Sequence, residues 1–159
     1  MSWLGREIVC PDEAALVDVA KNFAPLLTVG DVCLMRGELG AGKTFFTSQV
    51  YEALGGRPEI TGSPSFALVH VYPLAEKKIN IFHVDLYRLD SVVAEDDVGQ
   101  DQWMAPVAGI SFIEWAERLG DWRPQQGYVI HLWHLDEGRG IKIEALGKNE
   151  EMSLGSAKY

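Results

Sequence analysis

The sequence predicts one α/β domain in which helices flank a mainly parallel central sheet, with antiparallel strands toward the C-terminus. Three observations predict this fold class. Short apolar runs of strand type alternate with segments that have helical spacing. A glycine-rich turn joins one of these strands directly to a helix. The length of 159 residues suits a single core that needs no disulfide or metal to hold it together.

The first half of the chain contains two predicted helices, one strand and a loop. A helix is predicted over residues 11–24, where apolar side chains recur at intervals of three and four before a proline. The apolar run 32–35 is typical of a buried strand. Residues 43–54 are predicted to form a helix that ends at two glycines. Residues 55–64 are rich in Gly, Pro, Ser and Thr, so this segment is predicted to be a loop.

The second half supplies most of the predicted sheet. Strands are expected over 79–84 and 109–113, and each is followed by an acidic residue. The β-rich segments 128–135 and 141–146 are expected to be neighbours at the end of the sheet. Residues 94–103 are rich in acids, which predicts a short helix with a solvated surface.

Composition limits the classes of function. The chain has 14 Lys and Arg against 23 Asp and Glu, a net charge of −9. Tight autonomous binding to RNA or DNA needs many cationic contacts to phosphate, which this chain cannot supply by itself. The protein can still act near nucleic acid if a partner provides the basic surface. The predicted domain spans residues 1–146, and residues 147–159 are predicted to form a polar C-terminal tail.

Cysteine usage and hydropathy indicate the compartment. Cys10 and Cys33 lie far apart and do not have metal-ligand spacing, a pattern that fits a reducing environment. The sequence has no signal-peptide pattern and no apolar run that approaches 18 residues. We therefore expect a cytoplasmic protein that does not bind a membrane.

The glycine-rich turn carries the strongest functional signal. The segment Gly-Glu-Leu-Gly-Ala-Gly-Lys-Thr, from Gly37 to Thr44, matches the phosphate-loop pattern G-x-x-x-x-G-K-[ST] between a strand and a helix. Glycines allow the backbone to wrap around phosphates and direct N–H groups toward them. Lys43 can then reach the terminal phosphates, and the Thr44 hydroxyl can bind Mg²⁺. The N-K-x-D motif that GTPases use to recognise guanine is absent, so ATP is the expected nucleotide.

Two acids follow apolar strands and are candidates for the chemistry. Asp85 and Glu114 each come directly after a strand, at the sheet edge where open α/β sheets bind ligands. A phosphoryl-transfer site needs acids of this kind for Mg²⁺ and for orienting the nucleophile. A surface carboxylate at a strand end is the alternative for either residue alone. His83 shares a strand face with Asp85, and a structural hydrogen bond is predicted for it.

These motifs, in this order and spacing, resemble the TsaE family, also known as YjeE. The resemblance covers about residues 11–124. Beside the phosphate loop it rests on three segments: Ser63-Pro-Ser-Phe66, Asp85-Leu-Tyr-Arg-Leu89 and Ile113-Glu-Trp-Ala-Glu117. The family comprises small bacterial P-loop ATPases of tRNA threonylcarbamoyladenosine biosynthesis. The resemblance therefore implies a P-loop NTPase-like fold and a Mg²⁺-dependent ATPase activity.

The resemblance also implies roles for individual residues. It places Thr44 and Glu114 at Mg²⁺ and Lys43 on the phosphates. It makes Asp85 a second acid, which holds the metal directly or through water, or supports the attacking water. Lys43, Asp85 and Glu114 are thus the expected catalytic residues. The residues expected to contact the nucleotide are Glu13, near the base, then Gly37, Glu38, Leu39, Gly40, Ala41, Gly42, Lys43, Thr44, Phe45 and Trp115.

Three family features leave alternatives or depart from the usual pattern. Trp115 is expected either in the wall of the site or packed in the core. Ser63 and Ser65 belong to a switch-like loop that usually reads S-P-T-F in the family. Ser65 keeps the hydroxyl but loses the β-branch, which predicts a less rigid loop with its chemistry intact. Residues 91–99 have a thinner apolar face than the leucine-rich helix that is usual in the family.

Finally, the resemblance implies partners. TsaE proteins act with TsaB and TsaD, which transfer threonylcarbamoyl to adenosine 37 of tRNA, and ATP hydrolysis by TsaE resets that machinery between turnovers. Contact with tRNA would then be indirect, in agreement with the acidic charge, and no contact with DNA is expected. Two other functions remain open: a small-molecule kinase, and a nucleotide-gated binding module with negligible turnover. The scattered arginines disfavour the kinase, because kinases commonly close an Arg-bearing lid over the phosphates.

Overall fold

The structure is a computed structural model that describes residues 3–57, 69–87 and 100–150. The predicted switch-like loop with Ser63 and Ser65 lies outside the described residues. So do Arg88 and Leu89 of the D-L-Y-R-L motif and the family segment 91–99.

A seven-stranded sheet with the order β1-β7-β6-β2-β5-β4-β3 forms the centre of the molecule. The central strands β6, β2, β5 and β4 run parallel, whereas β7, β1 and β3 pair antiparallel with their neighbours. This arrangement confirms the predicted α/β class and the adjacent antiparallel strands near the C-terminus. In chain order the strands are β1 (Ile8–Cys10), β2 (Val32–Arg36), β3 (Val69–Leu74), β4 (Ile79–Asp85), β5 (Gly109–Glu114), β6 (Gln126–His134) and β7 (Arg139–Gly147).

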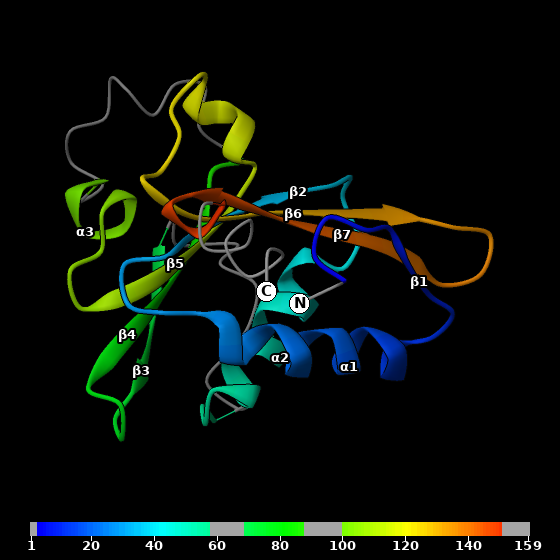
Figure 1. Ribbon diagram of the computed structural model, residues 1–159, viewed down its shortest axis with the longest axis horizontal. Coiled ribbons are helices and arrows are strands. Elements are labelled where there is room, and N and C mark those ends of the chain that lie inside the picture. Colours follow the sequence, from blue (N-terminus) through cyan, green and yellow to red (C-terminus); the bar gives the residue numbers. More distant parts are fainter. Residues whose placement is uncertain (1–2, 58–68, 88–99, 151–159) are drawn as a thin grey trace, which may run out of the picture.

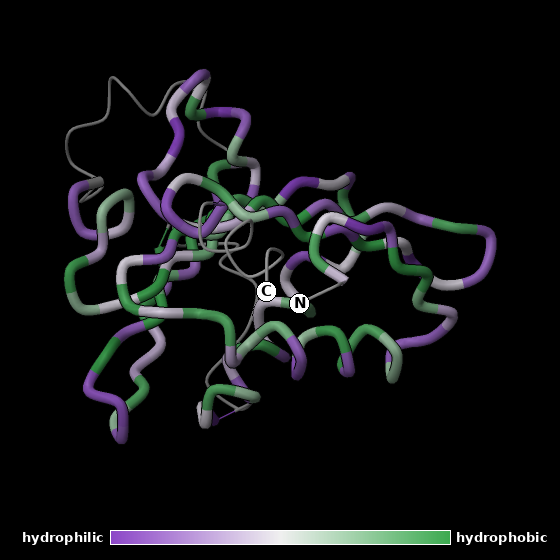
Figure 2. Tube along the Cα trace, in the orientation of Figure 1, coloured by the Kyte–Doolittle hydropathy of each residue, from purple (hydrophilic) through white to green (hydrophobic). Residues whose placement is uncertain are grey.

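Two helices lie together along one face of the sheet (Figure 1). They are α1 (Glu13–Phe23), which continues into a short 3-10 helix, η1 (Ala24–Leu26), and α2 (Lys43–Ala53). The side chain of Asp12 caps α1 by accepting a hydrogen bond from the Ala15 backbone N–H at 2.9 Å. Figure 2 shows hydrophobic and hydrophilic residues alternating around the turns of α1, as expected for a helix that covers a sheet.

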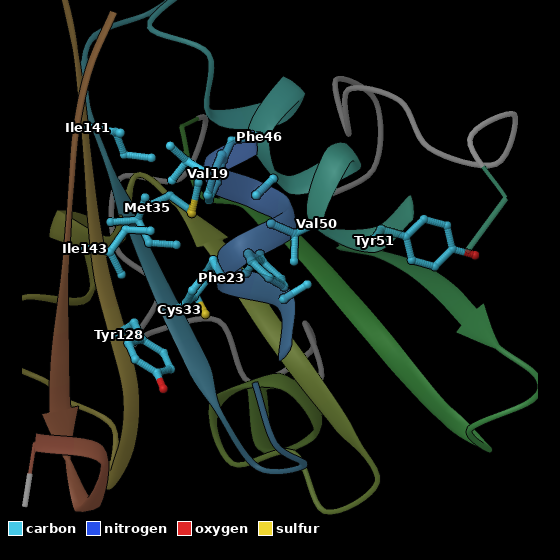
Figure 3. Close-up of a cluster of buried hydrophobic side chains, with 14 of the residues drawn as sticks. Val19, Phe23, Cys33, Met35, Phe46, Val50, Tyr51, Tyr128, Ile141 and Ile143 are labelled. Carbon is cyan, nitrogen blue, oxygen red and sulfur yellow. The ribbon is translucent and has the colours of Figure 1, made fainter. Parts of the chain in front are cut away.

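The larger part of the hydrophobic core lies between these helices and the sheet. In Figure 3, Phe23 of α1 and Val50 of α2 belong to the same buried cluster as the strand residues Met35 and Ile143. The Phe23 ring also packs edge-on against Tyr128, with 5.0 Å between ring centroids. Burying a side chain of this size contributes about 2 kcal/mol. Because α2 is packed into this core through residues such as Val50, the position of the phosphate loop that precedes α2 is fixed as well.

A second core lies on the other face, under the short helices α3 (Gln100–Met104) and η4 (Ala116–Leu119). It includes Trp103, whose side chain is only 1% exposed. The acid-rich segment 94–103 was expected to form a short helix with a solvated surface. Its described end is helical and Asp101 is exposed, but Trp103 is buried. Trp103 anchors α3 in the core because burial of its large apolar ring outweighs the polarity of its neighbours.

Two strands were missed by the sequence patterns. β1 has only three residues and pairs with β7, so it is too short to show a period. β3 alternates exposed and buried residues but contains Pro73, which argues against a strand interior. Within the described residues, β3 pairs only with β4 and lies at the edge of the sheet, where a proline is tolerated.

The C-terminal boundary is also set by the sheet. The predicted boundary after residue 146 falls inside β7, which ends at Gly147. Asn149 is 9% exposed and donates hydrogen bonds to Asp31 and to the Gly127 carbonyl. The chain is therefore attached to the domain at least as far as Asn149, and residues 151–159 of the predicted tail lie outside the described part. None of the helices in the described ranges has the length and apolar character needed to cross a membrane.

Candidate nucleotide-binding site

The predicted phosphate loop connects the end of β2 to the start of α2. Two of its glycines are required by the backbone. Gly42 caps α2 with φ 105°, in the left-handed region that other residues rarely adopt. At Gly37, a Cβ atom would lie 2.4 Å from the carbonyl oxygen of Leu132 on β6. The loop therefore passes too close to the neighbouring strand for any side chain at this position.

The remaining loop residues divide into an exposed tip and a buried base. Glu38 and Leu39 are exposed, Leu39 to 74%, while Ala41 is fully buried. The Ala41 N–H donates to the Glu38 carbonyl at 3.0 Å, which closes the tip. This turn places the tip at the surface, where a ligand can approach the loop, and keeps its base anchored to the fold.

Lys43 lies inside the loop. Its ammonium group donates to the Gly37 carbonyl at 2.7 Å and lies 4.1 Å from the centroid of the Trp115 ring. Burial lowers the pKa of Lys43, and the nearby carboxylates of Glu114, Glu117 and Asp85 oppose that shift. A desolvated cation at the head of a glycine loop is poised to bind an anion, because phosphate oxygens would replace the water that the ammonium group has lost.

The two predicted acids lie side by side at the same sheet edge. Asp85 and Glu114 are direct partners in the parallel β4–β5 pairing. The Thr44 hydroxyl donates to Glu114 Oε2 at 2.9 Å, so the first turn of α2 and the end of β5 are connected. The structure thus brings together Lys43, Thr44, Asp85 and Glu114, four residues that span about half the chain.

The surroundings of Asp85 affect the pKa of its carboxyl group in opposite directions. Burial raises its pKa, the hydrogen bond from the Tyr87 backbone N–H to Oδ1 at 3.0 Å lowers it, and the neighbouring Glu114 charge raises it again. The net direction is upward. A carboxylate whose ionised form is disfavoured, first by burial and then by the Glu114 charge, favours a nearby cation, such as Mg²⁺, that would neutralise it.

These side chains surround a cavity of about 230 Å³ at the loop. Its walls include all four of the residues named above. The complete lining is Leu39, Gly40, Gly42, Lys43, Thr44, Phe45, Asp85, Tyr87, Glu114 and Trp115. Every residue of this lining except Tyr87 was expected from the sequence to belong to the site.

The donor set fits Mg²⁺. Thr44, Glu114 and Asp85 offer oxygen atoms, which this hard cation prefers, and none of the described residues that line the cavity has a sulfur atom. Among the residues that the structure describes, no group of three His, Cys, Asp or Glu side chains could hold a metal alone. This sparse set suits Mg²⁺, which usually takes one or two carboxylates and completes its shell with phosphate oxygens and water.

Trp115 fills both of the roles considered for it. Its backbone is left-handed, with φ 60° and ψ 42°, an uncommon conformation for a bulky residue. This turn directs the indole toward Lys43 and against Tyr87, with 4.8 Å between the ring centroids. The ring also packs against the second hydrophobic core. Trp115 is therefore both a wall of the site and a core contact.

A second cavity, of about 410 Å³, adjoins the loop on the side of α1. It contains Glu13, as well as Gly40, Gly42 and Phe45, which line both cavities. Its full lining is Asp12, Glu13, Leu16, Gly40, Gly42, Phe45, Gly138 and Arg139. Glu13 thus lies in a cavity beside the phosphate loop, and its contact with the base of a nucleotide stays a prediction.

Arg139 was not predicted. Its guanidinium donates to the Gly40 carbonyl at 3.3 Å. Arg139 lies at the start of β7, almost one hundred residues after the loop, and only the hairpin of β6 and β7 brings it there. No local pattern in the sequence marks it.

His83 makes the structural hydrogen bond predicted for it. The imidazole lies between the Tyr72 hydroxyl and the Glu114 carboxylate. The sequence did not indicate either partner.

Comparisons with known proteins agree on one family. The model of the family "Threonylcarbamoyl adenosine biosynthesis protein TsaE" matches residues 10–141. The tRNA threonylcarbamoyladenosine biosynthesis protein TsaE of Bacillus subtilis (strain 168) is 32% identical, over 96% of this chain and 92% of the relative. The protein of the same name from Synechocystis is 36% identical over 71% of each chain. The crystal structure of YdiB from Bacillus subtilis superposes with a TM-score of 0.69 at 28% identity, covering 96% of this chain and 92% of YdiB.

Proposed function

Because the chain belongs to the TsaE family, whose role is in tRNA threonylcarbamoyladenosine biosynthesis, we propose that it is the ATP-binding and ATP-hydrolysing component of that process. The observation that carries the proposal is the Thr44–Glu114 hydrogen bond at the head of a complete phosphate loop, with Lys43 beside it. A loop that only bound phosphate would not need a buried carboxylate at this position.

The triphosphate of ATP would lie along the loop. Backbone N–H groups of residues 37–44 and the positive end of α2 would bind its oxygens. Lys43 would exchange its bond to the Gly37 carbonyl for bonds to the terminal phosphates. The adenosine would extend into the second cavity, between Glu13, Phe45 and Arg139. The shared glycines Gly40 and Gly42 support this path, because they make the two cavities continuous with the loop.

Thr44, Glu114 and Asp85 would hold Mg²⁺. The metal ion, when bound, supplies positive charge that stabilises the transferring phosphoryl group. The protein's own contribution is then to orient water and to balance charge. Glu114 is the favoured residue for accepting a hydrogen bond from the attacking water, because its Oε1 atom has no hydrogen-bond partner among the described residues. Asp85 would support the same water or the metal. Lys43 would stabilise the charge that develops on the γ-phosphate.

The proposed partners are TsaB and TsaD. In this arrangement the chain would act on their catalytic cycle, and tRNA would be held mainly by them. The net charge of −9 supports an indirect role toward tRNA. We expect a cytoplasmic protein whose ATP turnover is slow alone and faster when the partners complete the site.

Two measurements test this function. Calorimetric titration with ATP and with GTP, each with Mg²⁺, should show binding of ATP in clear preference to GTP. Phosphate release from ATP should be slow for the chain alone and should rise when purified TsaB and TsaD are added. Phosphate transfer to a metabolite would instead favour a small-molecule kinase. Partner binding that depends on ATP without phosphate release would favour the nucleotide-gated module.

A further inference from the structure

A buried pair of polar side chains, Tyr72 and His83, reaches the proposed catalytic acid without lining the cavity. The Tyr72 hydroxyl lies 3.2 Å from His83 Nδ1, and His83 Nε2 is hydrogen-bonded to Glu114 Oε2. The Thr44 hydroxyl donates to the same Oε2 atom at 2.9 Å. Tyr72, His83 and Glu114 are 2%, 1% and 4% exposed. The two hydrogen bonds of His83 are therefore shielded from competing water, which makes their loss costly.

The strand register explains how these residues meet. Asp85, not His83, lies directly opposite Glu114 in the β4–β5 pairing. His83 is two residues earlier on the same face and so occupies the diagonal position, which a long side chain can span. Its direct partner across β3 is His70, so Tyr72 is likewise a diagonal neighbour. The imidazole thus connects the edge strand β3 to the end of β5.

The chemistry of the groups assigns the direction of each hydrogen bond. An ionised carboxylate can only accept, so Nε2 of His83 must carry the proton that it shares with Glu114. In the neutral imidazole, Nδ1 is then left as an acceptor, and the Tyr72 hydroxyl can donate to it. Tyr72 thereby selects the imidazole tautomer that can bind Glu114.

Both hydrogen bonds to Glu114 end on one oxygen. His83 and Thr44 bind Oε2, while Oε1 has no hydrogen-bond partner among the described residues. Two donors on one oxygen fix the plane of the carboxylate as well as its position. We propose that His83 is a positioning residue that holds Glu114 by Oε2 and presents Oε1 to the metal and water of the bound nucleotide. This inference rests on the proposed ATPase function and goes beyond it by assigning the residue that orients the acid.

Two substitutions separate positioning from simple core packing. In His83→Gln, the side-chain nitrogen lies near the place of Nε2 and can still donate to Glu114. In His83→Leu, a side chain of similar size offers no donor. We expect His83→Leu to lower kcat by about 10- to 100-fold with little change in the KM for ATP, because a misoriented acid affects the transition state more than nucleotide binding. His83→Gln should recover most of the lost kcat.

A second readout does not depend on turnover. Binding of Mn²⁺, as a probe for Mg²⁺, to the complex with a non-hydrolysable ATP analogue should weaken in His83→Leu and recover in His83→Gln. Thermal unfolding of both variants would report their effect on folding. The inference is overturned if His83→Leu matches the wild type in kcat and Mn²⁺ affinity, or if both variants lose them equally.

The tautomer can be observed directly in the protein without nucleotide. Imidazole ¹⁵N NMR, with the His83 signals identified by their loss in His83→Gln, should show a proton on Nε2. A bare Nε2 would overturn the inference, because it could not donate to Glu114. If Nε2 is protonated and Mn²⁺ binding responds as expected while the wild type releases no phosphate, the ATPase proposal fails and the positioning role remains. If the wild type hydrolyses ATP and His83→Leu is unaffected, only the positioning role fails.

Discussion

Two buried carboxylates, Asp31 and Glu114, lie at opposite ends of the parallel strands β2 and β5. They differ in how their oxygen atoms are hydrogen-bonded. Asp31 is fully buried just before β2. Its Oδ1 accepts from the Gln126 and Asn149 amides, each at 2.9 Å, and its Oδ2 accepts from the Thr28 backbone N–H at 2.8 Å. Glu114, at the end of β5, has both of its hydrogen bonds on one oxygen.

The comparison distinguishes a structural carboxylate from one that is available for chemistry. Both oxygens of Asp31 accept hydrogen bonds from neutral donors, and these donors belong to three separate segments of the chain. Asp31 therefore connects those three segments. Glu114 keeps one oxygen without a partner in the described part of the chain, next to a desolvated lysine. A buried acid that the fold does not satisfy completely has capacity left for a ligand. Mutations around Asp31 should therefore change the stability of the fold, whereas mutations around Glu114 should change function.

The largest effect is expected at Lys43. Lys43→Ala should weaken ATP binding by about 100-fold, because it removes charge-assisted hydrogen bonds to the phosphates. Calorimetric titration would measure the change. Lys21→Ala, an exposed lysine in the last turn of α1, is the matched control and should bind ATP normally. Normal affinity in Lys43→Ala would contradict the assignment of the phosphate loop.

Asp31→Asn should have its effect on folding. In the variant, the NH₂ group of the new amide replaces one accepting oxygen and faces a group that is itself a donor. The hydrogen bond there is lost, so the free energy of unfolding should fall by about 2–3 kcal/mol. Urea denaturation would measure it, with the exposed Asp18→Asn as control. ATP affinity of the folded fraction should not change. A loss below about 0.5 kcal/mol would show that the hydrogen bonds to Asp31 do little for stability.

Asn149→Ala should lower the stability of the fold by less than Asp31→Asn does. The variant loses the bonds from Asn149 to Asp31 and to the Gly127 carbonyl. Because Asp31 keeps its other donors, we expect a loss of about 1 kcal/mol in urea denaturation. The exposed Lys148→Ala is the control. Equal stability of the two variants would mean that the segment after β7 does not hold the domain together.

The smallest effect on stability is expected at Asp85, with opposite sign. The folded-state pKa of Asp85 is raised, mainly by burial, so the folded protein binds this proton more tightly than the unfolded chain does. The stability that this residue contributes is present at low pH and is lost as the pH rises through the folded-state pKa. Asn cannot ionise, and its Oδ1 can still accept from Tyr87. Asp85→Asn should therefore raise the Tm of the nucleotide-free protein by about 1–2 °C at pH 8.

The pH dependence tests this interpretation. The Tm difference between Asp85→Asn and the wild type should shrink as the pH falls toward 5, since the wild-type carboxyl then becomes protonated more often. Adding Mg²⁺ and ATP should reverse the order, because the wild type gains a metal ligand that the variant lacks. A variant that is less stable than the wild type at every pH would contradict a raised pKa of Asp85 in the folded protein.

The candidate site and the surroundings of Asp31 also differ in how much of each could be predicted from the sequence. The phosphate loop and the acids after two strands follow local patterns, because glycine spacing and strand ends are visible within a few residues. Asp31 has no such signal. Its partners come from positions 28, 126 and 149, and only the placement of β6 beside β2 brings them together.

The same limit applies around the proposed site. Arg139 reaches the loop through the β6–β7 hairpin, and Tyr72 reaches His83 through β3, a strand hidden by Pro73. Lys43, Thr44 and Glu114 could be predicted because their chemistry demands particular residue types at fixed spacing. The residues that support them could not, because many side chains can donate a hydrogen bond and only the folded register selects one.

The most direct test of the unsaturated carboxylate is to remove its charge without changing its shape. In Glu114→Gln, we would measure phosphate release in the presence of TsaB and TsaD and, in parallel, the affinity for ATP. We expect phosphate release to fall by about 100-fold or more while ATP still binds and the Tm changes little. Retained phosphate release in a folded variant that binds ATP would contradict it, and would move the catalytic role away from Glu114.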